Sequence, residues 1–413
     1  MSEVERKCRL AREASVQMKY ASTEVKNKVL RAVAKELKAN TDTILAANKK
    51  DLEAAANLPI SLRKRLELDR EKIKAMAAGF LAVSKLPDPV GEVVEKWKLK
   101  NGLKVSRVRV PLGVIAFIYE SRPNVTAEAA SIVLKSGNAI VLRGGSEAVH
   151  SNVAIANVVR SACEEKRLPR EAVQMIESAD RESAAELMRM REYIDVLIPR
   201  GGAGLIRAAI ENARVPIIET GAGNCHIYVD KSADLKMAEN IIMNAKLSSP
   251  YVCNAVEHVL VHEKIAPKFI PRLYEKMTEA GVEFRGCDRT RMFIKGASAM
   301  SPEELSTEYL DLIIGVKLVG DTRQAIDHIN RYSTHHSDAI ITKSKKDAKL
   351  FTERVDSCCV YVNASTRFTD GYAFGLGGEV GISTQRLHAR GPLGLRELTT
   401  TKMIIEGKGQ IRK

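Results

Sequence analysis

The cysteine at position 253 is the side chain whose surroundings best suit a nucleophile. It follows the proline-broken segment 247–252, begins an apolar segment, and lies 34 positions after Glu219. We expect it in the first turn of a helix, where unpaired backbone N–H groups stabilise a thiolate. The alternative is that Cys253 is a small buried hydrophobic residue, which is the commoner role of a single cysteine in a helix.

A second candidate lies where a predicted strand runs into a predicted helix, in residues 113–126. This segment places Arg122 and Asn124 at the carboxyl end of the strand, the edge of an α/β sheet at which ligands bind. Asn124 is either a helix cap or an amide donor to an oxyanion. The backbone N–H of Cys253 would be the second donor.

Two glycine-rich segments directly follow predicted strands. Small residues at a strand end let the backbone approach a phosphate, and the following helix offers its N-terminus to the negative charge. Neither segment matches G-x-G-x-x-G, and each by itself is typical of a tight turn. Two in one sheet favour cofactor binding. The first comprises Arg143, Gly144, Gly145, Ser146 and Glu147, and the second comprises Pro199, Arg200, Gly201 and Gly202.

The composition describes a globular protein of more than one domain. A chain of 413 residues is too long for one hydrophobic core. Its hydrophobic content of 45% and charged content of 28% are ordinary for soluble proteins. The net charge of +14 comes from lysines and arginines interspersed with acids, which favours a solvated basic surface over a nucleic-acid-binding patch. Such a field also steers polyanionic substrates and phosphate-bearing cofactors.

The seven cysteines form no CxxC pair, so we expect neither a disulfide framework nor a zinc site, and no other metal. The N-terminal residues mix charges and lack the roughly 7–15-residue apolar run of a signal peptide. The sequence also has no run of about 18 apolar residues that would span a membrane. We therefore expect a cytoplasmic protein with neither a nucleic-acid nor a membrane partner.

Helices are expected over residues 1–85, where apolar residues recur at helical spacing. Residues 92–110 are predicted to form a β-hairpin, because two alternating segments flank Asn101-Gly102. This pair predicts a type I′ turn with positive φ at both residues. The hairpin is either a local sheet edge or an arm that packs against another subunit.

From residue 111 onward, continuous apolar strands alternate with helical segments, the pattern of a doubly wound parallel sheet. The alternation resumes at residue 255, so we expect two α/β domains joined near residues 219–230. Strands are predicted at residues 113–118, 138–142, 173–176, 195–199, 255–262, 313–319, 338–342 and 358–362, and helices at 127–134, 151–165 and 182–190.

Several motifs resemble the aldehyde dehydrogenase superfamily in order and spacing. Those shared with the superfamily are residues 113–115, 137–143 and 361–363 and the interval from Glu219 to Cys253. Within the superfamily the chain resembles the gamma-glutamyl phosphate reductase (glutamate-5-semialdehyde dehydrogenase) family over nearly its whole length. The motifs that carry this closer resemblance are residues 119–126, 223–230, 325–338, 375–384 and 390–395.

The resemblance implies an aldehyde dehydrogenase-like α/β fold with two doubly wound parallel-sheet domains. A dinucleotide-binding domain would comprise residues 1–91 and 111–224, and a catalytic domain carrying the thiol would comprise 225–390. Residues 92–110 and 391–413, the latter with a strand at 400–405, would form an oligomerisation element. We therefore expect a homo-oligomer, at least a dimer.

The activity that the resemblance implies is the NADPH-dependent reduction of L-glutamyl 5-phosphate to L-glutamate 5-semialdehyde, with release of phosphate, in proline biosynthesis. The Cys253 thiolate would attack the acyl phosphate, and hydride transfer to the resulting thioester would release the aldehyde. Asn124 and the Cys253 N–H would hold the oxyanion. By family position, Arg122, Ser383 and Thr384 would bind the substrate.

NADPH is the cofactor that the resemblance implies. Residues 143–147 correspond to the loop that meets the adenosine ribose, where an arginine and a serine suit a 2′-phosphate and Glu147 suits it less. Glu308 corresponds to the glutamate that binds the nicotinamide ribose.

Three further residues stand apart from this chemistry. In aldehyde-oxidising relatives the glutamate that matches Glu219 activates water, but a reductase must avoid hydrolysis of the thioester. Glu219 is therefore vestigial, structural or an aid in deprotonating Cys253. His226 and His336 lie beside strands and are expected to be hydrogen-bonded structural histidines.

Two other functions stay open at this point: an oxidising or acylating NAD(P)-dependent aldehyde dehydrogenase with another substrate, and a non-catalytic basic binding protein. The sequence contains no amino-acid kinase segment. If the chain is the reductase, glutamyl phosphate would arrive from a separate glutamate 5-kinase. Direct transfer between the two enzymes would protect the acyl phosphate, which cyclises and hydrolyses readily.

Overall fold

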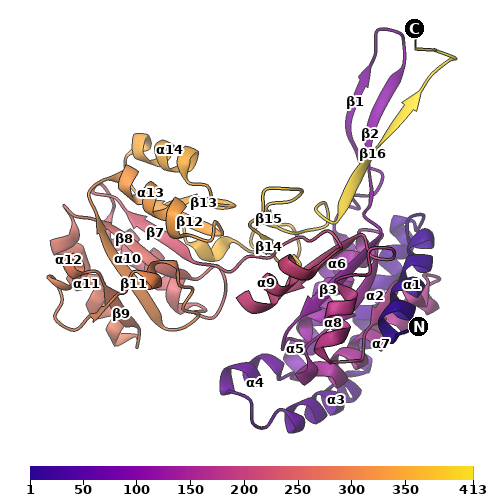
Figure 1. Ribbon diagram of the computed structural model, residues 1–413, viewed down its shortest axis with the longest axis horizontal. Helices are drawn as coiled ribbons and strands as arrows, with labels where there is room; N and C mark the ends of the chain where they lie inside the picture. The colour runs from indigo at the N-terminus through magenta and orange to yellow at the C-terminus, as the bar shows by residue number, and fades with distance from the viewer. Residues whose placement is uncertain (413) are drawn as a thin grey trace. The chain divides into compact units, whose positions relative to one another are not determined.

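The computed structural model describes residues 1–412, with side chains for all of these except 60, 61 and 203. The chain divides into two compact units (Figure 1). Unit 1 comprises Met1–Thr220, Gly375–Gly381 and Leu393–Lys413, and unit 2 comprises Gly221–Phe374 and Ile382–Pro392. Each unit contains a parallel sheet together with helices, so the predicted α/β class is confirmed.

The N-terminal part of unit 1 is helical, as predicted. Three of its helices begin at N-caps, because Ser2, Ser22 and Asp69 each accept a hydrogen bond from a backbone N–H of the first turn. Apolar residues at helical spacing, such as Val29 and Leu37, are buried. The helices are α1 (Glu3–Met18), α2 (Thr23–Ala39), α3 (Thr41–Ala54), α4 (Ile60–Leu66) and α5 (Arg70–Lys85).

The main sheet of unit 1 has four strands in the order β5-β4-β3-β6, and all pairs are parallel. Strands β3 and β4 are buried along their whole length, which explains their continuous apolar sequences. The carboxyl ends of β3, β4 and β6 lead into the candidate ligand-binding segments of this unit. The elements are β3 (Val114–Tyr119), α6 (Asn124–Lys135), β4 (Ala139–Arg143), α7 (Val149–Glu165), β5 (Val173–Met175), α8 (Arg181–Leu187), β6 (Val196–Arg200) and α9 (Ala203–Asn212).

A separate antiparallel sheet, which we call the arm, has the strand order β1-β2-β16 (Figure 1). The predicted hairpin is formed by β1 (Val93–Lys98) and β2 (Lys104–Pro111), and β16 (Thr399–Glu406) pairs antiparallel with β2. The arm exposes large apolar side chains from β1 and β16, such as Val93 and Ile405.

The turn of the arm differs from the type I′ prediction. Gly102 has a φ of 91°, whereas Asn101 is outside the positive-φ region. The Gly102 N–H donates to the Leu99 carbonyl at 2.9 Å. The Asn-Gly pair therefore ends a longer loop in which only the glycine adopts positive φ.

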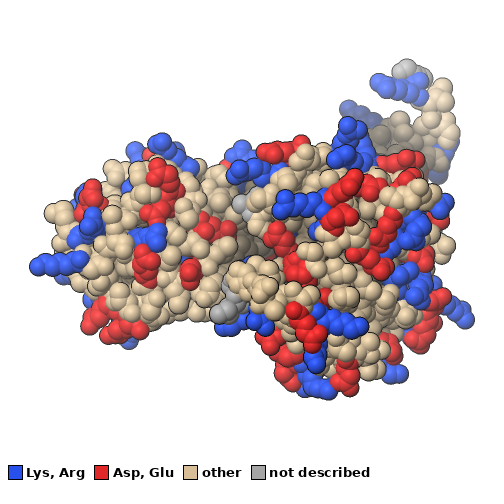
Figure 2. Space-filling view, turned by 60° about the horizontal axis from the view of Figure 1, so that its bottom comes forward, with Lys and Arg blue, Asp and Glu red and all other residues tan. Residues whose placement is uncertain are grey.

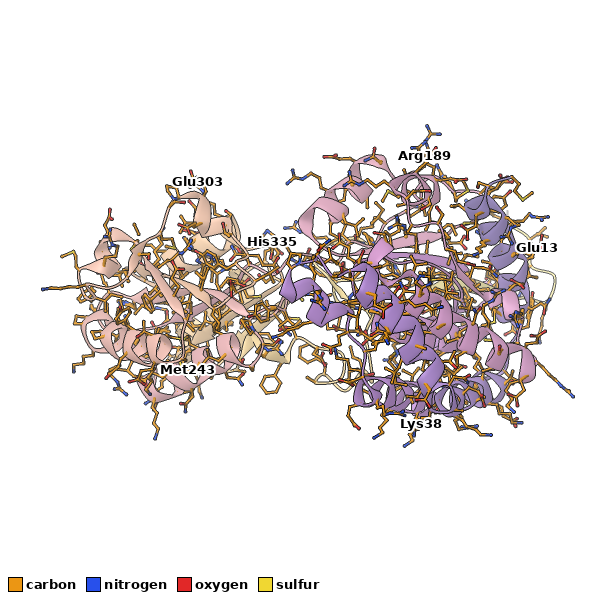
Figure 3. The ribbon with its side chains drawn as sticks, turned by 90° about the horizontal axis from the view of Figure 1, so that it is seen from below. Glu13, Lys38, Arg189, Met243, Glu303 and His335 are labelled. Atoms are coloured by element: carbon orange, nitrogen blue, oxygen red, sulfur yellow. The ribbon has the colours of Figure 1, made fainter. Side chains whose placement is uncertain are left out.

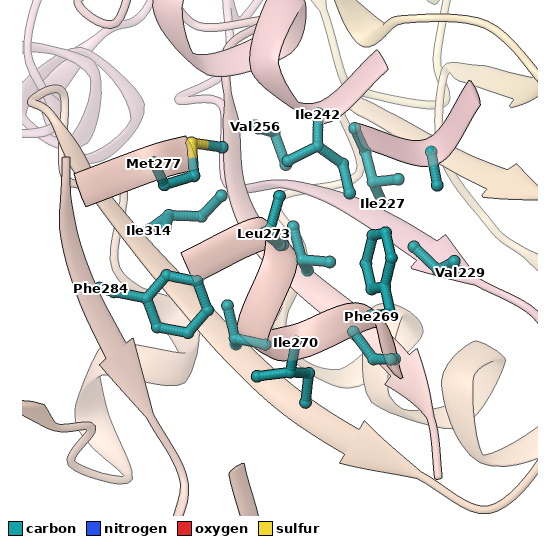
Figure 4. Close-up of a cluster of buried hydrophobic side chains, with 14 of the residues drawn as sticks. Ile227, Val229, Ile242, Val256, Phe269, Ile270, Leu273, Met277, Phe284 and Ile314 are labelled. Carbon is teal, nitrogen blue, oxygen red and sulfur yellow. The ribbon is translucent and has the colours of Figure 1, made fainter. Parts of the chain in front are cut away.

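The sheet of unit 2 has seven strands in the order β10-β9-β11-β8-β7-β12-β13, all parallel. Its main core joins Ile227 and Val229 of β7 with Ile242 of α10 and Phe269 of α11 (Figure 4). The elements are β7 (Cys225–Val229), α10 (Leu235–Leu247), β8 (Val256–His262), α11 (Ala266–Glu279), β9 (Glu283–Gly286), α12 (Asp288–Arg291), β10 (Ser298–Ala299), β11 (Ile313–Val319), α13 (Thr322–Tyr332), β12 (Ser337–Ile341), α14 (Lys345–Arg354), β13 (Cys359–Val362), β14 (Ile382–Ser383) and β15 (Gly391–Pro392).

Strand β7 was not predicted, and neither were the short strands β9, β10, β14 and β15. Residues 219–230 were expected to join two domains, yet they contain β7, which pairs with β8 and β12 inside the sheet. The division between the units falls just before it, between Thr220 and Gly221. The polar His226 interrupts the apolar run, so the sequence pattern did not indicate a strand here, although all five residues of β7 are buried.

None of the described helices combines the length and the apolar composition that a membrane span requires. Lysine and arginine side chains mingle with aspartate and glutamate over the face drawn in Figure 2. The face shown therefore has the interspersed charges that the sequence indicated.

Candidate active site

Cys253 lies in a turn between α10 and β8, and the helix predicted to begin there is wrong. α10 ends at Leu247, and β8 begins at Val256, three residues after the cysteine. The apolar run that follows Cys253 is this strand, which is buried along its whole length and rich in β-branched valine. The thiol is half-buried. Stabilisation of a thiolate by a helix N-terminus therefore does not apply to it.

Two residues that precede or begin β7 hold the backbone of Cys253. A Cβ built on Gly223 would stand 1.5 Å from the Cys253 carbonyl oxygen and 2.6 Å from its Cα. The Cys225 thiol donates a hydrogen bond to the same carbonyl oxygen at 3.1 Å. Burial raises the pKa of Cys225 well above its ordinary value, so this cysteine stays a thiol and a donor.

The residue that follows the nucleophile candidate is fixed as well. The Asn254 amide donates to the Thr369 carbonyl at 2.9 Å and to the Arg367 carbonyl at 3.3 Å. In return, the Thr366 hydroxyl donates to the Asn254 carbonyl at 2.7 Å. Contacts within unit 2 therefore hold the turn both at Cys253 itself and at the residue that follows it.

Glu308 is connected to this turn through Gly223. It follows the short helix η3 (Glu303–Ser306), whose first residue is labelled in Figure 3. One oxygen of its carboxylate accepts a hydrogen bond from the Gly223 N–H at 2.7 Å. Burial raises the pKa of Glu308. In unit 2, Gly223 therefore contacts both Glu308, which is proposed to bind the nicotinamide ribose, and Cys253, the proposed nucleophile.

A buried ion pair supports the backbone next to Glu308. The Lys246 ammonium lies 2.7 Å from the Glu257 carboxylate, and both side chains are fully buried. The ammonium also donates to the Asp311 carbonyl at 3.1 Å, and the other Glu257 oxygen accepts from the Leu310 N–H at 3.4 Å. Leu310 has a φ of 51°, which is uncommon for a residue with a Cβ. The pair therefore holds a strained backbone two residues after Glu308.

Sequence reasoning did not single out this pair, or the contacts of Gly223 and Cys225. The sequence does indicate a buried partner for Glu257, since a carboxylate inside a continuous apolar strand requires one. It gives no such indication for Lys246, because a lysine on a helix is usually exposed.

In unit 1, the N-cap of α6 is Pro123, and Asn124 is the first residue of the helix, so Asn124 does not occupy the cap position. Its amide donates to the Glu128 carboxylate, one turn later, at 2.7 Å. An amide NH₂ carries two hydrogens, so this contact leaves one for another acceptor. Arg122, two residues earlier, is half-buried.

Side chains of the loop after β4 form hydrogen bonds with other segments of unit 1. The Arg143 guanidinium donates to the carbonyls of Ala179 and Asp180 at 2.7 and 2.6 Å, and burial lowers its pKa. Glu147 accepts from the Ser121 backbone N–H at 2.7 Å and from the Ser121 hydroxyl. Ser146 is exposed, whereas Gly144 and Gly145 are buried.

The loop after β6 presents a backbone donor to an anionic oxygen. The Gly202 N–H, at the N-cap of α9, donates to the Glu120 carboxylate at 2.9 Å. A Cβ on Gly201 would meet the same carboxylate at 2.6 Å, so a side chain at this position would displace the Glu120 carboxylate. Before these glycines, the Pro199 carbonyl accepts from the Thr220 hydroxyl at 2.6 Å, and Arg200 is half-buried.

Ser383 and Thr384 belong to unit 2, at and just after β14. The Ser383 hydroxyl is buried and has no hydrogen-bond partner among the described residues. A buried unpaired hydroxyl is rare in proteins, so a ligand is a reasonable partner for it. Thr384 packs on Gly221, where a Cβ would lie 2.6 Å from the threonine methyl.

The two histidines and Glu219 have surroundings of their own. His226 is fully buried, and its Nδ1 lies 3.0 Å from the Asn224 carbonyl oxygen, as expected of a structural histidine. His336 is also buried, with Nδ1 2.9 Å from the Ser337 hydroxyl. Glu219 belongs to unit 1 and Cys253 to unit 2.

The chain is similar over its whole length to known proteins. The model of the aldehyde dehydrogenase family matches residues 1–292. The gamma-glutamyl phosphate reductase of Heliobacterium modesticaldum is 54% identical over 413 residues, which cover 100% of this chain and 99% of that protein. That of Carboxydothermus hydrogenoformans is 53% identical over 414 residues, which cover 100% of both chains. A crystal structure of the gamma-glutamyl phosphate reductase of Thermotoga maritima matches with a TM-score of 0.97 at 48% identity, over 100% of both chains.

The chain therefore belongs to the aldehyde dehydrogenase family. It is an enzyme of that family, which implies a nicotinamide cofactor. Within the family, its full-length relatives are gamma-glutamyl phosphate reductases, so the resemblance found in the motifs is confirmed.

The residues present fit a nicotinamide dinucleotide. Nε of Arg143 is buried without a hydrogen-bond partner among the described residues, so it is available to a phosphate or ribose oxygen. The Gly202 N–H binds a carboxylate oxygen of Glu120, an anion that stands where a phosphate oxygen would be accepted. Glu308 keeps a second carboxylate oxygen beyond the one that Gly223 occupies.

Proposed function

We propose that this chain reduces L-glutamyl 5-phosphate to L-glutamate 5-semialdehyde, releases phosphate and uses NADPH, as a step of proline biosynthesis. The observation that carries the proposal is the match over the whole chain to relatives named gamma-glutamyl phosphate reductase. The fixed turn of Cys253 supplies a nucleophile that suits this reaction.

In this proposal the Cys253 thiolate bonds to the acyl carbon, and the carbonyl π electrons move onto oxygen. Collapse of the tetrahedral species expels phosphate with the electron pair of the C–O bond and leaves a thioester. Contacts from Gly223, Cys225 and Asn254 hold the Cys253 backbone, so the sulfur attacks from a fixed position. When the aldehyde forms, the C–S bond breaks and the thiolate is regenerated.

Two donors are proposed for the oxyanion: the backbone N–H of Cys253 and the amide of Asn124. Glu128 takes one hydrogen of that amide, and the second hydrogen is the proposed donor. Donors aimed at developing charge are often the largest contribution to such catalysis.

NADPH, when bound, supplies the hydride that reduces the thioester. Glu308 would accept hydrogen bonds from the ribose hydroxyls on the nicotinamide side. Segments 143–147 and 199–202 would hold the adenosine and phosphate groups, with Arg143 and Ser146 as the donors proposed for a 2′-phosphate. Ser121 donates two hydrogen bonds to Glu147 and favours its ionised form, so the charge of Glu147 disfavours a 2′-phosphate beside it.

The substrate's α-amino and α-carboxylate groups would be bound by Arg122, Ser383 and Thr384. The Ser383 hydroxyl supports this assignment, since it is buried and lacks a partner among the described residues. Glu219 is given no catalytic role, because a base that activates water would hydrolyse the thioester instead of allowing its reduction.

Further proposals concern the assembly. The arm, with exposed Val93 and Ile405, is proposed to join copies of the chain in a homo-oligomer, since monomers rarely leave large apolar patches uncovered. A separate glutamate 5-kinase would supply the acyl phosphate, and the reaction would take place in the cytoplasm.

The test is the reverse reaction. Glutamate 5-semialdehyde and NADP⁺ should give NADPH only when inorganic phosphate is present, because phosphate must attack the thioester to form the acyl phosphate. NADPH formation that does not depend on phosphate would exclude the reductase and favour an oxidising aldehyde dehydrogenase. Formation that depends on coenzyme A would favour an acylating one.

A further inference from the structure

Two consecutive cysteines of unit 2 lie with their sulfurs side by side. Cys358 is in the bend before β13, and Cys359 is the first residue of that strand. Their Sγ atoms are 4.0 Å apart. Consecutive side chains within a strand point to opposite faces, so the bend at Cys358 is what brings the two sulfurs to the same side.

The two thiols differ in exposure and share a polar environment. Cys358 is half-buried and Cys359 is buried. The Cys358 sulfur lies 2.7 Å from the His336 carbonyl oxygen. On the neighbouring strand β12, Ser337 is the register partner of Cys359, and its hydroxyl lies 2.6 Å from that of Thr369.

This environment leaves one sulfur easier to ionise. The contact with Cys358 is the largest cause that lowers the pKa of Cys359, and the same contact raises the pKa of Cys358. Of the two sulfurs, that of Cys359 therefore ionises more readily, and a thiol lies next to it that can convert a sulfenic acid to a disulfide.

We propose that Cys358 and Cys359 form a modification site, a dithiol that hydrogen peroxide converts to a vicinal disulfide and that small thiols restore. The Cys359 thiolate attacks one peroxide oxygen, which gives a sulfenic acid and hydroxide. The Cys358 sulfur then displaces the sulfenic oxygen, and the thiol proton goes to the released water. In total, two thiols and one hydrogen peroxide give one disulfide and two waters, and the two electrons lost by sulfur are gained by oxygen.

The bond would be reversible because of where it lies in the chain. Consecutive Cα atoms are about 3.8 Å apart, whereas disulfides usually join Cα atoms about 4.4–6.8 Å apart. A disulfide between neighbours is therefore strained, and strained disulfides are the labile ones that cellular thiols reduce. The 4.0 Å distance between the two sulfurs lets the reduced pair chelate trivalent arsenic through both of them. An arsenical is therefore a probe of the pair that needs no oxidant.

The test uses full-length protein with Cys253→Ser, so that the candidate nucleophile consumes no oxidant. After hydrogen peroxide treatment, intact mass should fall by about 2 Da. Cysteines 358 and 359 share the tryptic peptide 355–367, which should resist alkylation by iodoacetamide until dithiothreitol is added. Phenylarsine oxide should bind in a single equivalent that dimercaptopropanol removes.

Matched variants locate the effect. Adding Cys358→Ser or Cys359→Ser should abolish both the mass loss and the arsenical binding. Adding Cys287→Ser, another half-buried thiol of unit 2, should leave both unchanged. The proposal is overturned if peptide 355–367 is alkylated at both cysteines after peroxide, if the disulfide joins other cysteines, or if arsenical binding survives either substitution in the pair.

Discussion

Gly223 lies directly against the backbone of Cys253, so closely that a Cβ at position 223 would stand 1.5 Å from the Cys253 carbonyl oxygen. The Gly223 N–H is also the donor to Glu308. One residue without a side chain therefore fixes the candidate nucleophile and a candidate cofactor ligand together.

Gly223→Ala should lower kcat by about a hundredfold or more, since displacement of a reacting group by about 1 Å costs that much. Gly204→Ala is the matched control, because nothing lies within 4 Å of a Cβ at that position, and it should retain activity. Initial rates and melting temperatures of both variants distinguish displacement of the thiol from general unfolding. A fully active Gly223→Ala protein would show that the contact does not position Cys253.

The buried pair of Lys246 and Glu257 predicts a stability effect. Glu257→Ala leaves the Lys246 ammonium buried without its counter-charge and should destabilise the protein by about 3–5 kcal/mol. Urea unfolding measures this change. Glu71→Ala breaks an exposed pair with Lys74 and should cost about 0–1 kcal/mol. Equal effects of the two substitutions would contradict the role of the buried pair.

His328 predicts a dependence of stability on pH. Burial, with smaller contributions from His226, Lys317 and Arg331, lowers its pKa to about 2. Its pKa in the unfolded chain is about 6.5, so below that pH the unfolded state binds a proton that the folded state lacks. The free energy of unfolding therefore falls as pH drops from about 6.5 toward 2, by about 1.4 kcal/mol per unit.

The measurement is urea unfolding of the wild type and of His328→Gln at about pH 7 and about pH 5, where the variant should lose roughly 2 kcal/mol less than the wild type. His150→Gln changes an exposed histidine and should lose as much as the wild type. Equal losses in all three proteins would contradict this assignment.

Asn124→Ala should lower kcat by about 10²–10³, the usual loss when one oxyanion donor is removed. The Michaelis constants should change little, because the interaction strengthens only as charge develops. Glu128→Ala is the control, since it removes the acceptor that Asn124 contacts but keeps the amide, and its loss should be much smaller. A large rise in KM with unchanged kcat would instead assign Asn124 to ground-state binding.

Much of the fold follows from local pattern. The continuous apolar sequences of β3, β4 and β8 predicted parallel strands, because strands covered on both faces have no polar side. The hairpin of the arm was predicted from the alternation of apolar and polar residues around Asn101-Gly102. Its turn type was not predicted correctly, because the turn type depends on how many residues the loop contains. β7 was missed because a buried histidine interrupts its apolar run.

The site was less accessible to such reasoning. Cys253 was proposed as the nucleophile from its sequence context. The helix predicted there is a turn, because Pro250 and the apolar residues after the cysteine are compatible with either structure. Contacts such as Lys246 with Glu257 depend on how a helix and a strand pack, and no local pattern specifies that packing. Asn124 and the two glycine-rich segments were proposed from their positions after predicted strands, whereas the roles of Glu308, Ser383 and Thr384 were proposed only through family resemblance.

The central claim is that Cys253 carries the acyl group. Its most direct test compares phosphate-dependent NADPH formation from glutamate 5-semialdehyde and NADP⁺ in the wild type, Cys253→Ala and Cys287→Ala. We predict no detectable rate for Cys253→Ala in a folded protein and an undiminished rate for Cys287→Ala. A phosphate-dependent rate in Cys253→Ala close to that of the wild type would contradict the account.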